Sequence, residues 1–83
     1  MVFRENLRRI RLTQFLSQAE LARRSGIHPL TVTRLENGKT APSTRTVRAL
    51  AQSLGVPASE LATPEEVAEA DRLHNQRTRN TRN

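Results

Sequence analysis

The sequence of 83 residues predicts a compact all-α domain of five short helices, with room for a short sixth helix. Apolar residues recur at helical spacing, as in the stripe Phe3, Leu7 and Ile10. Residues that favour helix starts precede such stretches, and glycines follow them. A chain of this length has one small core, and that core is aliphatic because Phe3 and Phe15 are the only aromatic residues.

The first two helices are indicated by periodicity and by capping chemistry. The Phe3 stripe predicts a first helix over about residues 3–14. Ser17 is a favourable N-cap, and Glu20 stands three residues later, so the two form a capping box at the start of a second helix.

The third and fourth helices have equally local signals. Pro29 suits the first helical position, because its missing N–H would have no partner there, and His28 is then the N-cap. Gly38 ends the third helix. After a loop, Ser43 caps a fourth helix that Gly55 ends.

The remaining chain divides into three parts. Residues 57–61 are expected to form a short fifth helix that completes a compact unit over residues 1–62. Thr63 and Pro64 start a sixth helix over residues 63–74, whose thin apolar set requires a partner surface. Residues 75–83 hold nothing to bury, and we expect disorder there.

Residues 18–37 have the spacing of two short helices packed across a tight turn. Ala22 lies where the helices meet, and Gly26 lies at the bend, where a left-handed backbone costs glycine little. The apolar contacts are supplied by Leu21, Ile27, Val32 and Leu35. This is a helix-turn-helix arrangement, in which the second helix is presented to the major groove of DNA.

The same segment resembles the XRE/Cro/C1 family of phage lambda repressor-like domains. The resemblance is carried by Gln18-Ala19-Glu20-Leu21-Ala22, Gly26 and Leu35-Glu36-Asn37-Gly38-Lys39-Thr40. Further matches are Arg11, Leu16 and Ser17 upstream, and Pro42, Ser43, Thr46, Leu50, Ala51, Leu54, Gly55 and Val56 downstream. The resemblance covers roughly residues 3–62. It implies a transcriptional regulator, most simply a repressor, that binds a double-stranded operator as a homodimer.

The outward face of the third helix is the candidate base-reading surface. Val32 and Leu35 define the buried side of this helix. Because successive residues are rotated by about 100° around the helix axis, the residues on the opposite, outward side can be identified. That face comprises Leu30, Thr33, Arg34 and Asn37. The resemblance implies an overlapping set of base contacts at Pro29, Leu30 and Arg34.

Each candidate has a second interpretation. The planar fork of Arg34 can pair with O6 and N7 of guanine, or the side chain meets only phosphate or solvent. Leu30 contacts a thymine methyl group or a partner protein. Thr31 and Thr33 can each reach bases or phosphates, and we assign Thr33 to bases and Thr31 to phosphates.

The resemblance also implies contacts to the DNA backbone on both sides of the third helix. Backbone amides at the start of the second helix point toward a DNA phosphate, and the loop after the third helix contacts the backbone of the other strand. The candidate phosphate-contacting residues are Ser17, Gln18, His28, Thr31, Asn37, Lys39, Thr40 and Arg45.

Two positions concern the first helix. The resemblance implies that Arg11 and Glu36 form an ion pair that ties the first helix to the end of the third. The alternative is that Arg11 reaches phosphate and Glu36 caps its own turn. Phe15 stands where glycine is common in the family. Either the turn differs here, or Phe15 covers an apolar patch.

Charge is unevenly distributed along the chain, which has a net charge of +6. Residues 1–50 carry +7, residues 51–71 carry −5, and residues 72–83 carry +4. A basic body suits a polyanionic partner. No catalytic constellation is visible, and His28 and His74 are too isolated to be metal ligands, so we expect neither enzymatic activity nor a metal or cofactor.

The absence of Cys, of a signal peptide and of a membrane-length apolar run predicts a cytoplasmic, nucleoid-associated protein. The resemblance implies that the dimer contacts lie at Val56, Pro57 and Leu61. Two other functions compete. One is a helix-turn-helix antitoxin that regulates its own operon and docks a toxin through acidic residues 60–71. The other is a protein-bridging module without specific DNA readout.

Overall fold

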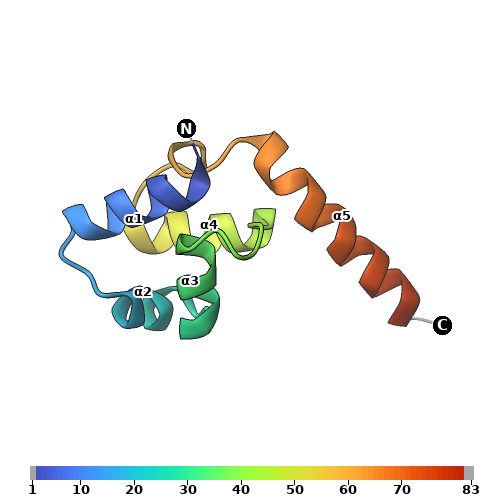
Figure 1. The fold of residues 1–83 in the computed structure, drawn as a ribbon, viewed down its shortest axis with the longest axis horizontal. Coiled ribbons are helices and arrows are strands. Elements are labelled where there is room, and N and C mark those ends of the chain that lie inside the picture. Colours follow the sequence, from blue (N-terminus) through green and yellow to red (C-terminus); the bar gives the residue numbers. More distant parts are fainter. Residues whose placement is uncertain (1, 82–83) are drawn as a thin grey trace.

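The structure, a computed structural model, describes residues 2–81 and the side chains of residues 2–73. Within that range it contains helices α1 (Phe3–Thr13), α2 (Gln18–Ser25), α3 (Pro29–Glu36), α4 (Thr44–Leu54) and α5 (Pro64–Thr81), the 3-10 turn η1 (Ala58–Glu60), and no strand (Figure 1). The prediction of an all-α fold is confirmed. The expected fifth helix is the single turn η1.

The helix ends follow the capping signals in the sequence. Ser17 Oγ accepts a hydrogen bond from the Glu20 N–H (3.0 Å), and Glu20 Oε1 accepts one from the Ser17 N–H (2.9 Å). The bond from the Ser17 N–H to the carboxylate favours the charged form and holds the pKa of Glu20 below its ordinary value. Gly26 and Gly55 close α2 and α4 in the left-handed conformation, with φ of 73° and 70°.

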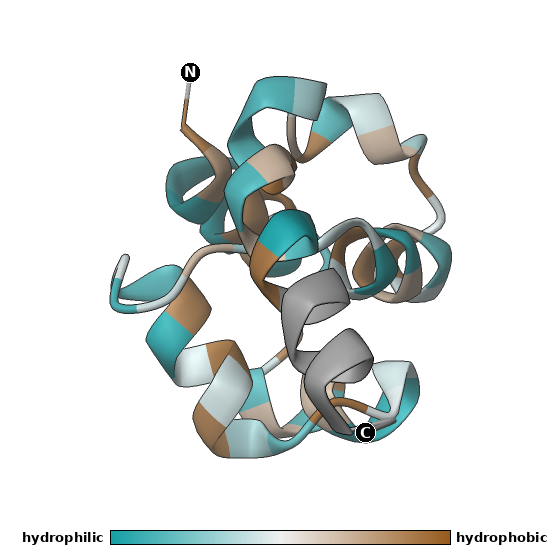
Figure 2. Ribbon diagram, turned by 90° about the vertical axis from the view of Figure 1, so that its right-hand side faces the viewer, coloured by the Kyte–Doolittle hydropathy of each residue, from teal (hydrophilic) through white to brown (hydrophobic). Residues whose placement is uncertain are grey.

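One apolar core lies where α1 to α4 meet. Its buried side chains are Phe3, Leu7, Ile10, Leu16, Leu21, Ala22, Val32, Leu35, Val47, Leu50, Ala51, Leu54 and Leu61. Figure 2 shows hydrophilic positions along the outer sides of these helices. The core includes the stripe Phe3, Leu7 and Ile10 of α1 and the inward-facing Val32 and Leu35 of α3 that the sequence indicated.

Leu61 belongs to this core. Its side chain is 0% exposed, and its carbonyl accepts a hydrogen bond from Asn6 Nδ2 (3.0 Å). The prediction that Leu61 lies at a dimer surface is therefore wrong, because the turn η1 directs this side chain back onto its own chain.

Helix α5 is longer than the sequence indicated. It begins at Pro64 with a reciprocal cap, in which the Thr63 N–H donates to Glu66 Oε1 (2.9 Å), and it continues to Thr81. We expected disorder over residues 75–83, whereas residues 75–81 are helical in this structure, and residues 82–83 lie outside the described part of the chain. No Gly or Pro follows Pro64, and Arg and Gln are good helix formers, so nothing local ends the helix once it has started.

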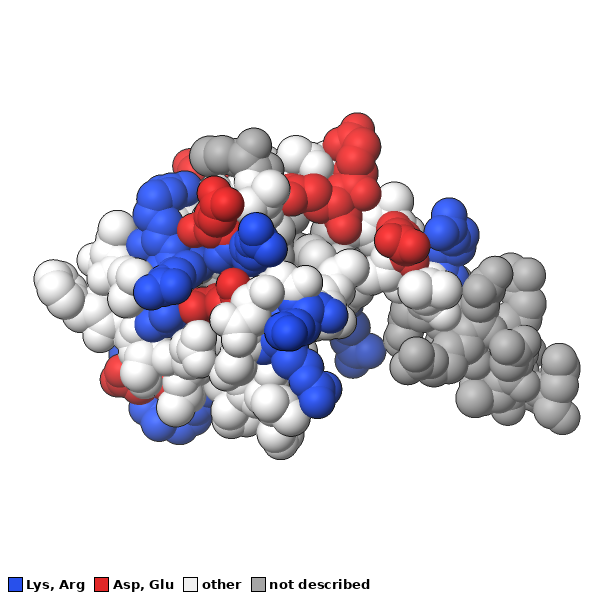
Figure 3. All heavy atoms as spheres, viewed as in Figure 1, with Lys and Arg blue, Asp and Glu red and all other residues white. Residues whose placement is uncertain are grey.

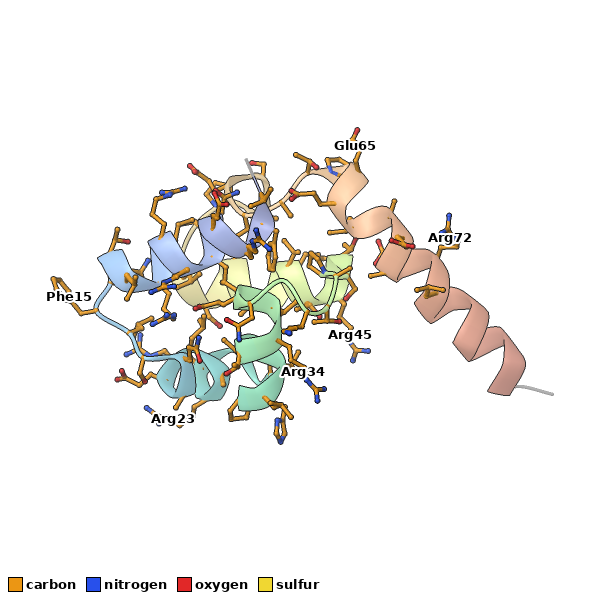
Figure 4. The ribbon with its side chains drawn as sticks, viewed as in Figure 1. Phe15, Arg23, Arg34, Arg45, Glu65 and Arg72 are labelled. Atoms are coloured by element: carbon orange, nitrogen blue, oxygen red, sulfur yellow. The ribbon has the colours of Figure 1, made fainter. Side chains whose placement is uncertain are left out.

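Phe15 takes the backbone conformation that glycine would favour. Its φ is +57°, and its side chain is 93% exposed at the turn between α1 and α2, where Figure 4 shows it extending away from the body. Neither interpretation holds, because the turn keeps the left-handed conformation and Phe15 adopts it despite its Cβ. The side chain covers no apolar patch of its own chain.

Candidate nucleic-acid interface

Packing between α2 and α3 fixes the orientation of the third helix. The bend at Gly26 turns the chain back, and the small side chain of Ala22 is 2% exposed at the crossing. Val32 and Leu35 on α3 are 0% and 1% exposed. Because these contacts are fully buried, α3 is held rigidly, and its opposite face remains exposed to solvent.

The remaining face of α3 carries the candidate base-reading residues. Pro29, Leu30 and Arg34 are exposed, and Leu30 keeps 48% of its surface accessible. Figure 4 shows the side chain of Arg34 extending away from the body. The structure therefore brings these three residues together on one outward surface at the first two turns of α3.

Thr33 differs from its neighbours, because it is half-buried and its hydroxyl is engaged. Thr33 Oγ1 donates to Gln18 Oε1 (2.8 Å), and Gln18 Nε2 donates to Glu36 Oε1 (3.0 Å). Gln18 thus links the first residue of α2 to two positions of α3. Both residues serve the orientation of α3 in this structure, beside the DNA contacts that the sequence predicted for them.

Arg11 and Glu36 form the ion pair that the sequence suggested. Arg11 Nε donates to Glu36 Oε2 (2.6 Å), and Arg11 Nη2 donates to Glu36 Oε1 (2.9 Å). The bond to Glu36 holds the pKa of Arg11 above its ordinary value, although burial acts in the opposite direction. Arg11 and Glu36 are 8% and 9% exposed, so Arg11 is directed into the protein and not toward phosphate.

The candidate phosphate contacts surround α3. Ser17 and His28 are exposed but engaged as caps, since His28 Nδ1 accepts the Leu30 N–H (3.1 Å). Thr31 and Gln18 are half-buried, whereas four others are exposed: Asn37, Lys39, Thr40 and Arg45. Figure 3 shows Lys and Arg spread over this view of the body, with Asp and Glu concentrated where α5 begins.

The sequence did not identify Arg4 as part of this surface. A Cβ added to Gly38 would lie 2.5 Å from Arg4 Nη1, so the guanidinium of Arg4 lies directly over the loop that follows α3. A cation at this point complements the negative end of the α3 dipole and adds charge beside Lys39. The contact joins positions far apart in sequence, and no local pattern indicates it.

Two other features bear on the type of site. In the described part of the chain, no group of three or more His, Cys, Asp or Glu residues is arranged to hold a metal ion. No described helix combines the length and the apolar character needed to cross a membrane.

Comparisons with known proteins agree with this geometry. A family model described as helix-turn-helix matches residues 7–61. The crystal structure of the restriction-modification controller protein C.AhdI from Aeromonas hydrophila is similar, with a TM-score of 0.70 and 33% sequence identity. The similarity covers 72% of this chain and 91% of that chain. A search of curated proteins found no significant match.

The matched region contains α2, α3 and the candidate residues from Ser17 to Arg45, and the resemblance to XRE/Cro/C1 proteins is confirmed. The chain therefore belongs to the XRE-type helix-turn-helix family and is a DNA-binding transcriptional regulator.

Proposed function

We propose that this protein binds a specific operator as a homodimer, places α3 of each chain in the major groove, and represses transcription by occluding a promoter. One observation carries the proposal: the exposed Pro29, Leu30 and Arg34 face of α3, held by buried contacts. A recognition element must keep its orientation while it reads base edges, and the network behind α3 supplies that rigidity.

Within this proposal the residues of α3 have distinct roles. Arg34 pairs with a guanine, and Leu30 contacts a thymine methyl group beside it. Pro29 starts the helix at the groove. We assign Thr33 mainly to positioning, because its hydroxyl already donates to Gln18. Lys39, Arg45 and Arg4 hold the phosphate backbone next to the half-site.

The proposed dimer contact is smaller than the sequence suggested. Leu61 lies in the core, which leaves half-buried Val56 and exposed Pro57 at the loop between α4 and η1. A contact of this size gives a weak dimer in solution. Two linked half-sites on the operator would then supply most of the stability of the complex.

Operator regulation is favoured over the antitoxin alternative. Two of the five acids in the segment that a toxin would bind are engaged with the body of the chain, since Glu66 accepts the Phe3 N–H and Asp71 accepts the Thr44 N–H. One solved structure that resembles this chain is that of a restriction-modification controller protein, which also supports a role in the control of transcription.

Selection of bound sequences from random DNA tests the proposal. We expect enrichment of an inverted repeat with half-site centres about 34 Å apart, one helical turn. Sedimentation of the complex with that duplex should show two chains per site, and a reporter gene under an operator-containing promoter should be expressed less. Bound DNA without a preferred sequence, or one chain per full site at saturation, contradicts the proposal.

A further inference from the structure

We propose that α5 is an arm whose arginine-rich end binds the DNA backbone beside the half-site, and that Glu66 and Asp71 hold the arm in place. The inference rests on the proposed function for its partner, which is double-stranded DNA. Helix α5 begins three residues after the last residue that the helix-turn-helix model matches, so this contact is additional to the family surface.

The charge of α5 changes sign along its length. Residues 64–71 hold four acids and no base, whereas residues 72–81 hold three arginines and no acid. Figure 3 shows the acids gathered at the start of the helix, next to the body. The acidic start of the helix therefore suits positively charged groups, and its basic end suits a negatively charged partner.

The acidic half is attached to the body at two helix N-termini. Glu66 Oε2 accepts the Phe3 N–H at the first residue of α1 (2.9 Å). Asp71 Oδ1 accepts the Thr44 N–H at the first residue of α4 (2.8 Å), and Asp71 Oδ2 accepts the Thr44 hydroxyl. The first N–H groups of a helix have no acceptor within the helix and carry partial positive charge. Each carboxylate therefore supplies a hydrogen-bond acceptor and a negative charge that the helix itself lacks.

Apolar packing reinforces this attachment. Val67, one residue after Glu66, packs against the core, and α1 has no side-chain cap of its own apart from the bond that Glu66 provides. The first two turns of α5 are thus fixed by one apolar contact and two charged anchors. A helix fixed in this way sets the direction of the residues that follow it.

That direction leads toward the DNA-facing side. The Asp71 anchor lies at Thr44, next to the phosphate candidate Arg45, and α5 continues ten residues further, which is about 15 Å at 1.5 Å per residue. Figure 1 shows the end of α5 projecting past the body, and Figure 4 shows Arg34 and Arg45 extending on the side toward which it runs. The basic end therefore reaches DNA just outside the half-site.

A duplex flank suits this end better than a protein surface does. The segment offers positive charge without acids, and the phosphates of a duplex offer continuous negative charge that needs no sequence match. Contact with a second copy is the competing occupant, and the same experiment identifies it.

The test compares two double variants of the full chain with matched loss of charge. Arg77→Gln with Arg79→Gln alters the end of α5, and Arg23→Gln with Arg24→Gln alters two exposed arginines of α2. Each protein is titrated with the selected operator, either trimmed at the half-sites or extended by about one helical turn, roughly 10 base pairs, on each side. The readouts are the slope of log affinity against log salt concentration and the gain from the flanks.

We expect the unchanged protein to bind the extended duplex more tightly and with a steeper salt slope. The α5 variant should lose about 0.9 units of slope per lost contact, close to 2 units per chain, together with the gain from the flanks, and should keep its preferred sequence. The α2 variant should keep both. Asp71→Ala, which retains every arginine, should also lose the gain in affinity from the flanks, because the orientation of α5 relative to the body is no longer fixed by the bond to Thr44.

Several outcomes overturn the inference. One is an unchanged slope and flank gain in the α5 variant, and another is an equal loss in the α2 variant. A third is weakened self-association of the α5 variant in sedimentation, with its flank gain intact, which would make the end of α5 a contact between copies. Failure of the proposed function is distinct, since the unchanged protein would then show no preferred sequence while these salt slopes could still be compared on random duplex.

Discussion

Arg11 and Glu36, separated by 25 positions, form a two-point contact in which Arg11 Nε and Nη2 each donate to one oxygen of the Glu36 carboxylate. Arg11 Nη1 also donates to the carbonyl of Leu16 (2.7 Å), at the turn before α2. The guanidinium thus joins α1, the following turn and the last residue of α3. The recognition helix is oriented from its carboxyl end by this pair and from its middle by Thr33 and Gln18.

This pair predicts strong coupling between the two residues. Removing either one leaves the other charge buried without its partner, which costs about 3–5 kcal/mol of folding free energy. In a double-mutant cycle of Arg11→Ala and Glu36→Ala, measured by chemical unfolding, the two losses should be non-additive by about 0.5–3 kcal/mol. Arg8→Ala, an exposed position of the same helix, combined with Glu36→Ala serves as the control and should be additive. Additive losses for the Arg11 pair would mean that the contact does not form in solution.

Phe15 is a position where a single change should stabilise the protein. Its φ of +57° costs a residue with a Cβ roughly 1–2 kcal/mol, and a side chain that is 93% exposed returns little of this through packing. Phe15→Gly should therefore raise the free energy of unfolding by about 1 kcal/mol, after allowance for the greater freedom of unfolded glycine. Phe15→Ala keeps the Cβ and should show no such gain. A loss of stability in Phe15→Gly would show that the ring makes a contact in solution that the exposed turn does not indicate.

Leu61 distinguishes a core residue from a dimer contact. Since its side chain is fully buried, Leu61→Ala should lower the free energy of unfolding by about 2–5 kcal/mol. Ser59→Ala, at an exposed position of η1, should change it by no more than about 0.5 kcal/mol. Thermal unfolding across a range of protein concentrations is the measurement. Native stability of the Leu61 variant together with loss of dimerisation would return this residue to the interface.

Lys39 should contribute to DNA affinity without contributing to sequence preference. It is exposed in the loop after α3, beside the guanidinium of Arg4 over Gly38. If it neutralises one phosphate, Lys39→Gln should reduce the salt slope of operator binding by about 0.9 per chain. Arg24→Gln, on α2, should leave the slope unchanged. A new preferred sequence in the Lys39 variant would point instead to a base contact.

The sequence predicted the features that depend on neighbouring residues. The capping box of Ser17 and Glu20, the left-handed bend at Gly26 and the inner face of α3 all follow from residues within a few positions of one another. Helical periodicity alone separated Arg34 from Val32, and the structure exposes the first and buries the second. Capping, backbone preference and helical periodicity depend on neighbouring residues alone, so tertiary packing does not change them.

The features that the sequence missed depend on tertiary packing. The family resemblance placed Leu61 on a dimer surface, and a five-residue segment has too little periodicity to show which way it faces. In the sequence Glu66 and Asp71 are simply members of an acidic segment, and only the packed structure shows that each binds the N-terminus of another helix. The length of α5 was missed because composition argued for disorder, whereas a helix anchored at its start needs less from its own residues to continue.

The central claim is that α3 reads bases through Arg34, and the affinities of Arg34→Ala for the selected operator and for random duplex of equal length test it most directly. If Arg34 pairs with a guanine, operator binding should weaken by about 1–3 kcal/mol per half-site, and one position of each half-site should lose its preference. Binding to random duplex should change much less, and Arg24→Ala should alter neither preference nor specificity. Equal weakening of Arg34→Ala on operator and random duplex, with every position of the preferred sequence retained, would contradict base readout and leave Arg34 as a phosphate contact.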